Sequence, residues 1–187
     1  MAERSGGREG NNRMNKRVRK VFPQVGIELI REGAEFPKIK TKGSAGADLV
    51  CPEDVEIPPF HMIGHGTLVP LGFRLDIPEG YCVHIYPRSS TGLKTPFIIP
   101  NSPGLIDTDY KEEVCLILTN LSRTTLRVDK GTALAQMVLV PKVSYELIVP
   151  RYGERVDPLD EAGERTGGFG STTNNKKEKG EVKDDEN

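Results

Sequence analysis

Short apolar segments alternate with proline and glycine along the middle of the chain, from about Val25 to Val149. Each segment is shorter than an ordinary helix and is bounded by residues that end strands or form turns. This rhythm is typical of an all-β sandwich or barrel. The segments that we expect to form strands are VGIELI, TLVPLGFRLDI, YCVHIY, EVCLILT, TLRV, ALAQMVLV and YELIV.

The segment YCVHIY illustrates the alternation. Tyr81, Val83 and Ile85 occupy one parity, so a strand would direct all three to one drier face. Prolines recur between positions 58 and 141 and leave no clean window with helical periodicity. We therefore expect at most one short helical turn, around Ser89 to Lys94.

The two ends of the chain differ from the middle in composition. Residues 1–20 are rich in Gly, Asn, Arg and Lys, and the final stretch NNKKEKGEVKDDEN mixes both charge signs. Segments so poor in large apolar side chains cannot bury enough surface to offset the entropy of ordering. We expect one β domain at 23–152, a disordered basic arm at 1–22, a linker and glycine-rich arm at 153–173, and a charged disordered tail at 174–187.

Length and charge limit the classes of function. The chain of 187 residues has room for one ordinary domain, and its formal net charge of −1 gives no global case for binding nucleic acid or an anionic membrane. The basic cluster between Arg13 and Lys20 would allow only weak, non-specific contact with nucleic acid. No apolar run approaches the roughly 20 residues that cross a bilayer, and no secretory signal is present. We expect a cytoplasmic protein without a membrane partner.

Histidines and cysteines offer little chemistry. His61 and His65 have the spacing of a zinc-binding helix, but Gly64 interrupts the segment and the glutamate of an HExxH motif is missing. The chain also lacks a GxSxG nucleophile elbow. Its three cysteines are widely spaced and form no CxxC pair, so we expect them to be reduced and mostly structural.

The segment PRSSTGLK gathers groups that bind phosphate. It offers the guanidinium of Arg88, the hydroxyls of Ser89 and Ser90, and backbone N–H groups at the start of a short helical turn. Ser and Thr also satisfy backbone groups at such a connection without any ligand. On this segment alone, a phosphate site and a capped connection both stay open.

The segment ERTGGFGSTT lies beyond the last expected strand and is rich in glycine. The aromatic face of Phe169 could stack on a base, while Arg165, Ser171 and Thr172 could reach phosphates. A flexible linker would have the same composition. The two alternatives are an arm that closes over a nucleotide and a plain linker.

The segment GLIDTDYKEE places four acidic side chains and one tyrosine directly after an apolar pair. In a regular strand Asp107 and Asp109 would share a face and repel each other. The segment is therefore a metal clamp, a catalytic carboxylate or a charged turn. Phosphate donors, an aromatic stacker and an acidic segment together are what binding and hydrolysing a nucleoside phosphate would need.

Five segments in order resemble the five motifs of trimeric dUTPases: SAGADL, PRSSTG, GLIDTDY, ALAQMV and GGFGST. The resemblance covers roughly Val25 to Thr173. It implies a homotrimer of jelly-roll-like β subunits, in which each active site is assembled from three chains and the C-terminal arm closes over a neighbour's pocket. The implied reaction is hydrolysis of dUTP to dUMP and pyrophosphate with Mg²⁺, which limits uracil incorporation into DNA and supplies dUMP for dTMP synthesis.

The resemblance also implies roles for individual residues. Asp107 would deprotonate the water that attacks the α-phosphorus, and Tyr110 would pack against the deoxyribose and leave no space for a 2′-hydroxyl. A regular strand would place these two side chains on opposite faces, so we predict a hairpin bend near Thr108. Asp109 then belongs to a turn or an interchain contact. Asp48 would lie near Mg²⁺ or its waters, with the metal held mainly by the three phosphates.

The other implied contacts divide between the base and the phosphates. A pocket that hydrogen-bonds the uracil edge would reject cytosine, because its own groups would be left unpaired. Thymine would be excluded by lack of room for its methyl group. The residues expected at the base are Asn101, Leu105, Ile106, Asp107, Cys115 and, stacked over it, Phe169. Those expected at the phosphates are Arg88, Ser89, Ser90, Gln136 and Arg165, with Ser171 and Thr172 in the closing arm.

Several positions depart from the family pattern. Glu112 stands where glycine is common, and Ala133 stands where arginine is common. In the last motif Arg165 is one residue closer to the phenylalanine than usual, and Thr173 replaces a final glycine. Two alternatives to the hydrolase share this fold: a nucleotide-gated regulatory protein, and a dCTP deaminase, for which no catalytic glutamate is recognisable here.

Overall fold

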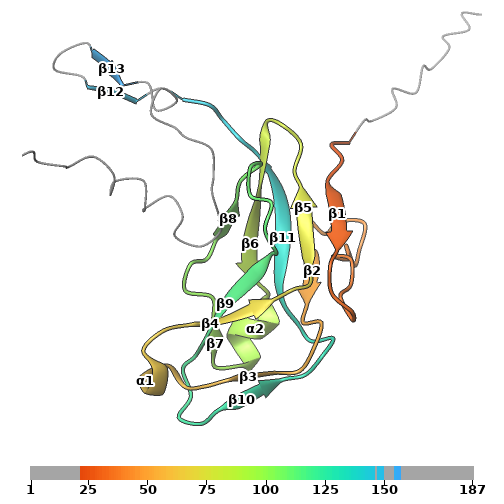
Figure 1. Cartoon of the computed structure of the whole chain (residues 1–187), viewed down its shortest axis with the longest axis vertical. Helices are drawn as coiled ribbons and strands as arrows, with labels where there is room; N and C mark the ends of the chain where they lie inside the picture. Colours follow the sequence, from red (N-terminus) through yellow and green to blue (C-terminus); the bar gives the residue numbers. More distant parts are fainter. Residues whose placement is uncertain (1–21, 146, 150–153, 157–187) are drawn as a thin grey trace, which may run out of the picture.

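The computed structural model describes residues 22–145, 147–149 and 154–156. Within them β-strands predominate, as the sequence predicts (Figure 1). The predicted arms and tail fall almost wholly outside the described residues, so their bounds stay a prediction. The elements are β1 (Gly26–Leu29), β2 (Ala47–Val50), β3 (Val55–Ile57), α1 (Phe60–Ile63), β4 (Thr67–Pro70), β5 (Phe73–Asp76), β6 (Tyr81–Pro87), α2 (Ser89–Lys94), β7 (Phe97–Ile98), β8 (Gly104–Ile106), β9 (Cys115–Asn120), β10 (Leu126–Val128), β11 (Ala133–Pro141), β12 (Leu147–Val149) and β13 (Glu154–Val156).

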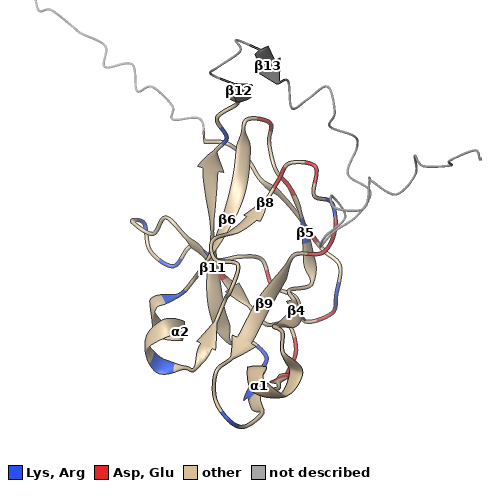
Figure 2. Ribbon diagram, turned by 90° about the vertical axis from the view of Figure 1, so that its left-hand side faces the viewer, with Lys and Arg blue, Asp and Glu red and all other residues tan. Residues whose placement is uncertain are grey.

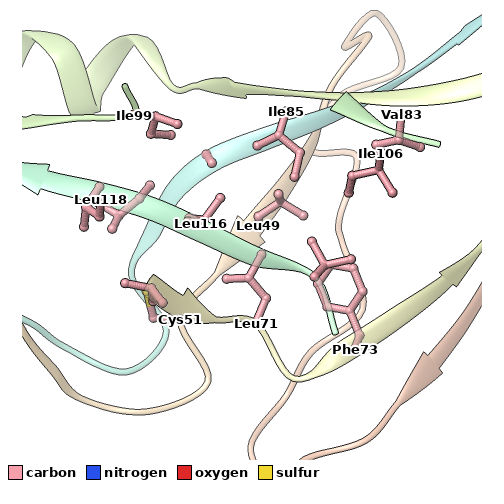
Figure 3. Packing of buried hydrophobic residues seen from close by; sticks show 14 of the residues in the cluster. Leu49, Cys51, Leu71, Phe73, Val83, Ile85, Ile99, Ile106, Leu116 and Leu118 are labelled. Carbon is pink, nitrogen blue, oxygen red and sulfur yellow. The ribbon is translucent and has the colours of Figure 1, made fainter. Parts of the chain in front are cut away.

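Two antiparallel sheets form the body of the molecule. One has the strand order β2-β11-β6-β8 and the other the order β4-β9-β7. Their facing side chains make a common apolar core, in which Val83 and Ile85 from the first sheet meet Leu116 and Leu118 from the second (Figure 3). The smaller ladders β1–β5, β3–β10 and β12–β13 complete the strand pairing. This jelly-roll-like β-sandwich is the predicted fold class.

Strand β6 has the predicted alternation. Val83 and Ile85 are buried in the core, while His84 and Tyr86 lie half-buried on the outer face and hydrogen-bond each other between Nδ1 and the phenolic oxygen at 3.0 Å. Cys82 is also buried, so the outer face of the strand is not fully solvated. The period of two therefore identified the core side correctly.

A bulge in β11 fixes the start of helix α2. The register against β2 shifts between Ala133 and Ala135. The carbonyl of the intervening Leu134 accepts hydrogen bonds from the Arg88 backbone N–H at 3.1 Å and from the Thr91 hydroxyl at 2.7 Å. Because bulges turn backbone groups away from the ladder, this one anchors the connection after β6. The helical turn predicted at Ser89–Lys94 is confirmed.

A second helical turn, α1, shows that the expectation of at most one was wrong. It follows two prolines, and Pro59 has φ −62°, which suits the entry to a helix. Gly64 ends it in the left-handed conformation, with φ 73°. Proline and glycine, which interrupt helical periodicity in the sequence, here mark the two ends of the turn.

The cysteines are free thiols, as predicted. Cys51 and Cys82 are buried, and Cys115 is half-buried. Burial raises the pKa of the Cys51 and Cys115 thiols to about 11, so both stay protonated near neutral pH. No helix in the described part of the chain is long and apolar enough to span a membrane.

Gly72, between β4 and β5, can be compared with Gly80, between β5 and β6, to test how tightly the β4–β5 turn is packed. Both have positive φ, 77° and 79°. A Cβ on Gly72 would lie 2.6 Å from the Cβ of Ala34, whereas one on Gly80 would meet nothing within 4 Å. We expect Gly80→Ala to lower the free energy of unfolding by about 1 kcal/mol through backbone strain alone. Gly72→Ala should lower it by roughly 1–3 kcal/mol more, because the contact must be relieved.

Urea denaturation of both variants at one protein concentration measures the difference. Equal losses would contradict the close approach of the two backbone segments at Gly72.

Candidate functional site

Five predicted site residues lie together at one end of the four-stranded sheet. Gln136 on β11 stands opposite Asp48 on β2 and opposite Tyr86 on β6. Arg88 follows β6 directly and leads into α2. We call this group the polar cluster: Asp48, Arg88, Ser89, Ser90 and Gln136.

Two partners fix the Arg88 side chain: Asp48 of the polar cluster and the backbone of Ala133. Its Nε lies 3.0 Å from Oδ1 of Asp48, and its Nη1 donates to the carbonyl of Ala133 at 3.0 Å. Asp48 is buried, and its Oδ2 has no hydrogen-bond partner among the described residues. A buried carboxylate oxygen without a partner is costly and marks a place where a ligand would complete the bonding.

Gln136 is held against a glycine of the first motif. A Cβ on Gly46 would lie 2.4 Å from Oε1 of Gln136, so the amide occupies the space that a side chain there would fill. The amide nitrogen donates weakly to the carbonyl of Pro87 at 3.4 Å. The glycine therefore lets the first and fourth motifs approach each other.

The hydroxyls of the second motif divide into structural and available groups. Thr91 is buried and donates to the Leu134 carbonyl, and its own carbonyl accepts from the Thr95 hydroxyl at 2.7 Å. Ser89 is exposed and Ser90 half-buried, and α2 has no side-chain cap. The first backbone N–H groups of a helix have no partner within it. The segment thus contains both a structural connection and polar groups open to a ligand.

The acidic segment turns between the two sheets. The N–H of Tyr110 donates to the carbonyl of Asp107 at 3.2 Å, which closes a turn across Thr108 and Asp109. The predicted bend is therefore present. It is not a hairpin, however, because β8 pairs with β6 while β9 pairs with β4 and β7 in the other sheet. The turn carries the chain across the sandwich.

Within this turn, Tyr110 is only 9% exposed, and its hydroxyl donates to the carbonyl of Glu113 at 2.8 Å. Asp107 is half-buried and Asp109 is exposed. The turn thus contains the half-buried Asp107 and, three residues later, a tyrosine that packs in the apolar core.

Sequence reasoning missed two residues that hold this turn. The Glu113 carboxylate accepts hydrogen bonds from Nε and Nη2 of Arg31 at 2.6 and 2.8 Å. These bonds, more than any other group, hold the pKa of the Glu113 carboxyl below its ordinary value. The sequence singles out the neighbouring Glu112 only as a departure from the family pattern, and Glu112 is exposed. No local pattern indicates a partner 82 residues away.

Among the described residues, those predicted at the base lie in this turn or in the segments that flank it. Leu105 is 60% exposed, whereas the Ile106 side chain is buried in the core, so only the Ile106 backbone can face a ligand. Asn101 is exposed beside Gly104. The Cys115 thiol is directed to the carbonyl of Glu113 at 3.5 Å.

The polar cluster and the acidic turn lie at opposite ends of β6. Ile106 stands opposite Val83, whereas Arg88 follows the far end of the strand. At 3.3 Å per residue, the strand separates these two positions by about 16 Å. Figure 1 shows β8 and α2 at the two ends of the sheet, and in Figure 2 acidic residues surround the end of β8 while α2 carries basic residues. One chain alone does not bring Asp107 to Arg88.

The remaining site predictions concern a pocket, a metal and the C-terminal arm. An open cavity of about 420 Å³ is lined by β1, β5 and Lys111 and contains none of the predicted site residues. In the part of the chain that the structure describes, no three His, Cys, Asp or Glu side chains cluster as metal ligands. Arg165, Phe169, Ser171 and Thr172 lie outside the described residues.

Sequence comparison agrees with the five motifs. Residues 32–173 match the family model of dUTPases. The deoxyuridine 5′-triphosphate nucleotidohydrolase of Hydrogenobaculum sp. (strain Y04AAS1) is 40% identical over 147 residues, which cover 78% of this chain and 95% of that protein. The enzyme of the same name from Brucella suis biovar 1 (strain 1330) is 40% identical over 154 residues, covering 80% and 93%.

Solved structures share the fold. A mutant dUTPase from phage phi11 of S. aureus, reported with the coordination of a structural Mg(II) ion, has a TM-score of 0.60 and 24% identity, over 69% of this chain and 98% of that one. The dUTPase of Staphylococcus bacteriophage 80alpha with dUPNHPP, reported to control transfer of virulence genes by a G protein-like mechanism, has a TM-score of 0.61 and 23% identity, over 78% and 98%.

Identities this low establish the fold alone, but the curated relatives are much closer and are matched over nearly their whole length. Together with the family model, which spans residues 32–173 and so includes all five motifs, they confirm the resemblance: the chain belongs to the dUTPase family.

Proposed function

We propose that the protein hydrolyses dUTP to dUMP and pyrophosphate in active sites that are assembled between the chains of a homotrimer. Family membership supports the reaction. The observation that supports a shared site is the separation of the polar cluster from the acidic turn along β6, by about 16 Å at the rise of a strand. A substrate that contacts both must lie between two chains.

The polar cluster is suited to bind the triphosphate. Arg88 is already oriented by Asp48 and by the Ala133 carbonyl, so binding would require little ordering of its side chain. Ser89, Ser90 and Gln136 add neutral donors around it. A charged fork supported by fixed neighbours binds phosphate oxygens strongly and holds them in one geometry.

The acidic turn supplies the proton acceptor and the sugar contact. Carboxylates accept a proton from water that lies within hydrogen-bond reach, and we assign this role to Asp107. Tyr110 packs against the deoxyribose and excludes a 2′-hydroxyl. Uracil meets Asn101, the backbone of residues 105–107 and Cys115, and unpaired groups reject cytosine.

Mg²⁺ fits the polar cluster as a metal bound through the substrate. The orphaned Oδ2 of the buried Asp48 is an oxygen ligand of the kind that Mg²⁺ prefers, directly or through water. Because no protein cage is present among the described residues, the phosphates would supply the other ligands. The metal would neutralise charge on the triphosphate. We further propose that Arg165, Phe169, Ser171 and Thr172 belong to an arm that closes over the nucleotide.

Release of pyrophosphate from dUTP in the presence of Mg²⁺ tests the reaction. Absence of release by the purified protein would refute it. Retained dUTP binding without release would instead support the nucleotide-gated regulatory alternative, and release of ammonia from dCTP would support the deaminase.

Asp107→Asn should lower kcat by about 10²–10⁴, the range typical of a lost general base, and leave dUTP affinity largely unchanged. The matched control is Asp109→Asn, which removes the same charge from the exposed neighbour in the same turn. Steady-state kinetics and equilibrium binding measure the two effects. Equal kcat values in the two variants would exclude Asp107 as the base.

Mixed trimers test the shared site directly. Asp107→Asn and Arg88→Ala should each be inactive alone. When the two variants are co-expressed and assemble at random, a site that takes one residue from each of two chains is intact about a quarter of the time. We expect the mixture to recover activity near that fraction of the wild type. Recovery of no activity in trimers shown to contain both chains would place the whole site within one subunit.

A further inference from the structure

We infer that Arg31 and Glu113 form a clamp that positions Tyr110 and thereby sets the discrimination between deoxyribose and ribose. The inference rests on the proposed contact of Tyr110 with the sugar. Neither clamp residue is among those that the sequence motifs assign to the substrate, and both act through Tyr110 as positioning residues.

The link to the tyrosine passes through the backbone of Glu113. The Tyr110 hydroxyl donates to the Glu113 carbonyl at 2.8 Å. This hydrogen bond positions the hydroxyl end of the tyrosine ring against the Glu113 carbonyl. The position of this carbonyl depends in turn on what holds Glu113 in place.

Two sets of contacts hold Glu113. The Gly72 N–H donates to Oε1 of the Glu113 carboxylate at 2.9 Å, and Arg31 binds both carboxylate oxygens. The next residue, Val114, donates to the Phe73 carbonyl at 2.9 Å and accepts from the N–H of Leu71 at 2.9 Å. Glu113 is thus tied to the β4–β5 turn by its side chain and by the backbone beside it.

The N-terminal segment delivers Arg31 to this place. Ile30 donates to the Gly72 carbonyl at 2.8 Å, directly before Arg31. A Cβ on Gly72 would lie 3.2 Å from the Arg31 Cβ and closer still to Ala34. The segment therefore packs closely against the β4–β5 turn. The Arg31 guanidinium forms a bidentate ion pair with the Glu113 carboxylate, which a lysine would not reproduce.

The clamp is less exposed than the ion pair between Lys111 and Asp76, which connects the end of the acidic turn to β5. The side chains of Glu113 and Arg31 are 18% and 46% exposed, whereas those of Lys111 and Asp76 are 58% and 84% exposed. Exposed pairs of single hydrogen bonds contribute little. The lowered pKa of the Glu113 carboxyl, caused chiefly by the Arg31 hydrogen bonds, is consistent with a carboxylate that stays charged at neutral pH.

Steric exclusion of one hydroxyl demands a tyrosine ring with little freedom. Groups that discriminate or react must be held within about 0.5 Å of their working position by the residues behind them. Loosening the Glu113 carbonyl would let the ring move aside, so that a ribonucleotide fits and a deoxyribonucleotide is held less firmly.

The experiment compares kcat/KM for dUTP and UTP in the full-length enzyme. We expect Glu113→Ala to lower the dUTP/UTP ratio on the order of tenfold, as small misplacements of positioning groups commonly do. Arg31→Ala should lower the ratio less, because Gly72 still holds the carboxylate, and Arg31→Lys should restore only part of it. The matched control Asp76→Asn, which releases the exposed Lys111 tie, should keep the wild-type ratio.

A double-mutant cycle separates positioning from general stability. Tyr110→Phe keeps the ring and removes the hydroxyl that contacts Glu113. If the clamp acts through that hydrogen bond, Glu113→Ala should change the ratio little further when Tyr110→Phe is already present. Independent, multiplying effects would overturn the clamp.

Two results distinguish this inference from the proposed function. In the first, Glu113→Ala lowers the melting temperature but keeps the dUTP/UTP ratio within about twofold of the wild type, a difference in free energy too small to count as lost discrimination. This result would overturn the clamp and leave the sugar role of Tyr110 standing. An unchanged ratio in Tyr110→Ala would overturn that sugar role and the clamp together.

Discussion

The register of β6 is the constraint on which the site depends. This strand pairs along its whole length with β11, and through its central residues Val83–Ile85 with β8. The first ladder brings Gln136 and Asp48 beside the start of α2, and the second places the acidic turn at the other end of the strand. Because a shift of one residue would turn Val83 and Ile85 out of the core, burial fixes the register. The positions of both halves of the site therefore follow from the packing of the sandwich.

Each half is then fixed by a different kind of interaction. The polar cluster depends on a bulge at Leu134 and on an ion pair whose acidic member is buried. The acidic turn depends on a tyrosine packed into the core and on Glu113, held by a segment from the start of the domain. The first arrangement is local to neighbouring strands. The second is assembled from three distant parts of the sequence, so its order depends on the complete fold.

The sequence predicted features that depend on local patterns. The alternation in YCVHIY identified the buried face of β6, and the donors of PRSSTGLK marked the helical turn at α2. Five short motifs carried the family. Strand pairing was beyond such patterns because ladders join distant residues, and so the predicted hairpin at Thr108 proved to be a crossing between sheets. The contact of Glu113 with Arg31 was beyond local patterns for the same reason, because the two residues are 82 positions apart.

The separation of the two halves also bears on how the site keeps its shape before a substrate binds. A guanidinium beside a carboxylate tends to pair with it, which would occupy both the proposed phosphate-binding group and the proposed proton acceptor. In this chain Arg88 is already paired with Asp48 and bonded to the Ala133 carbonyl, while Asp107 is held at the far end of the same strand. In the proposed homotrimer a second chain would supply the other half, and each group would arrive with its orientation set by its own subunit. Activity would then require assembly, because neither subunit alone could bind both ends of the substrate.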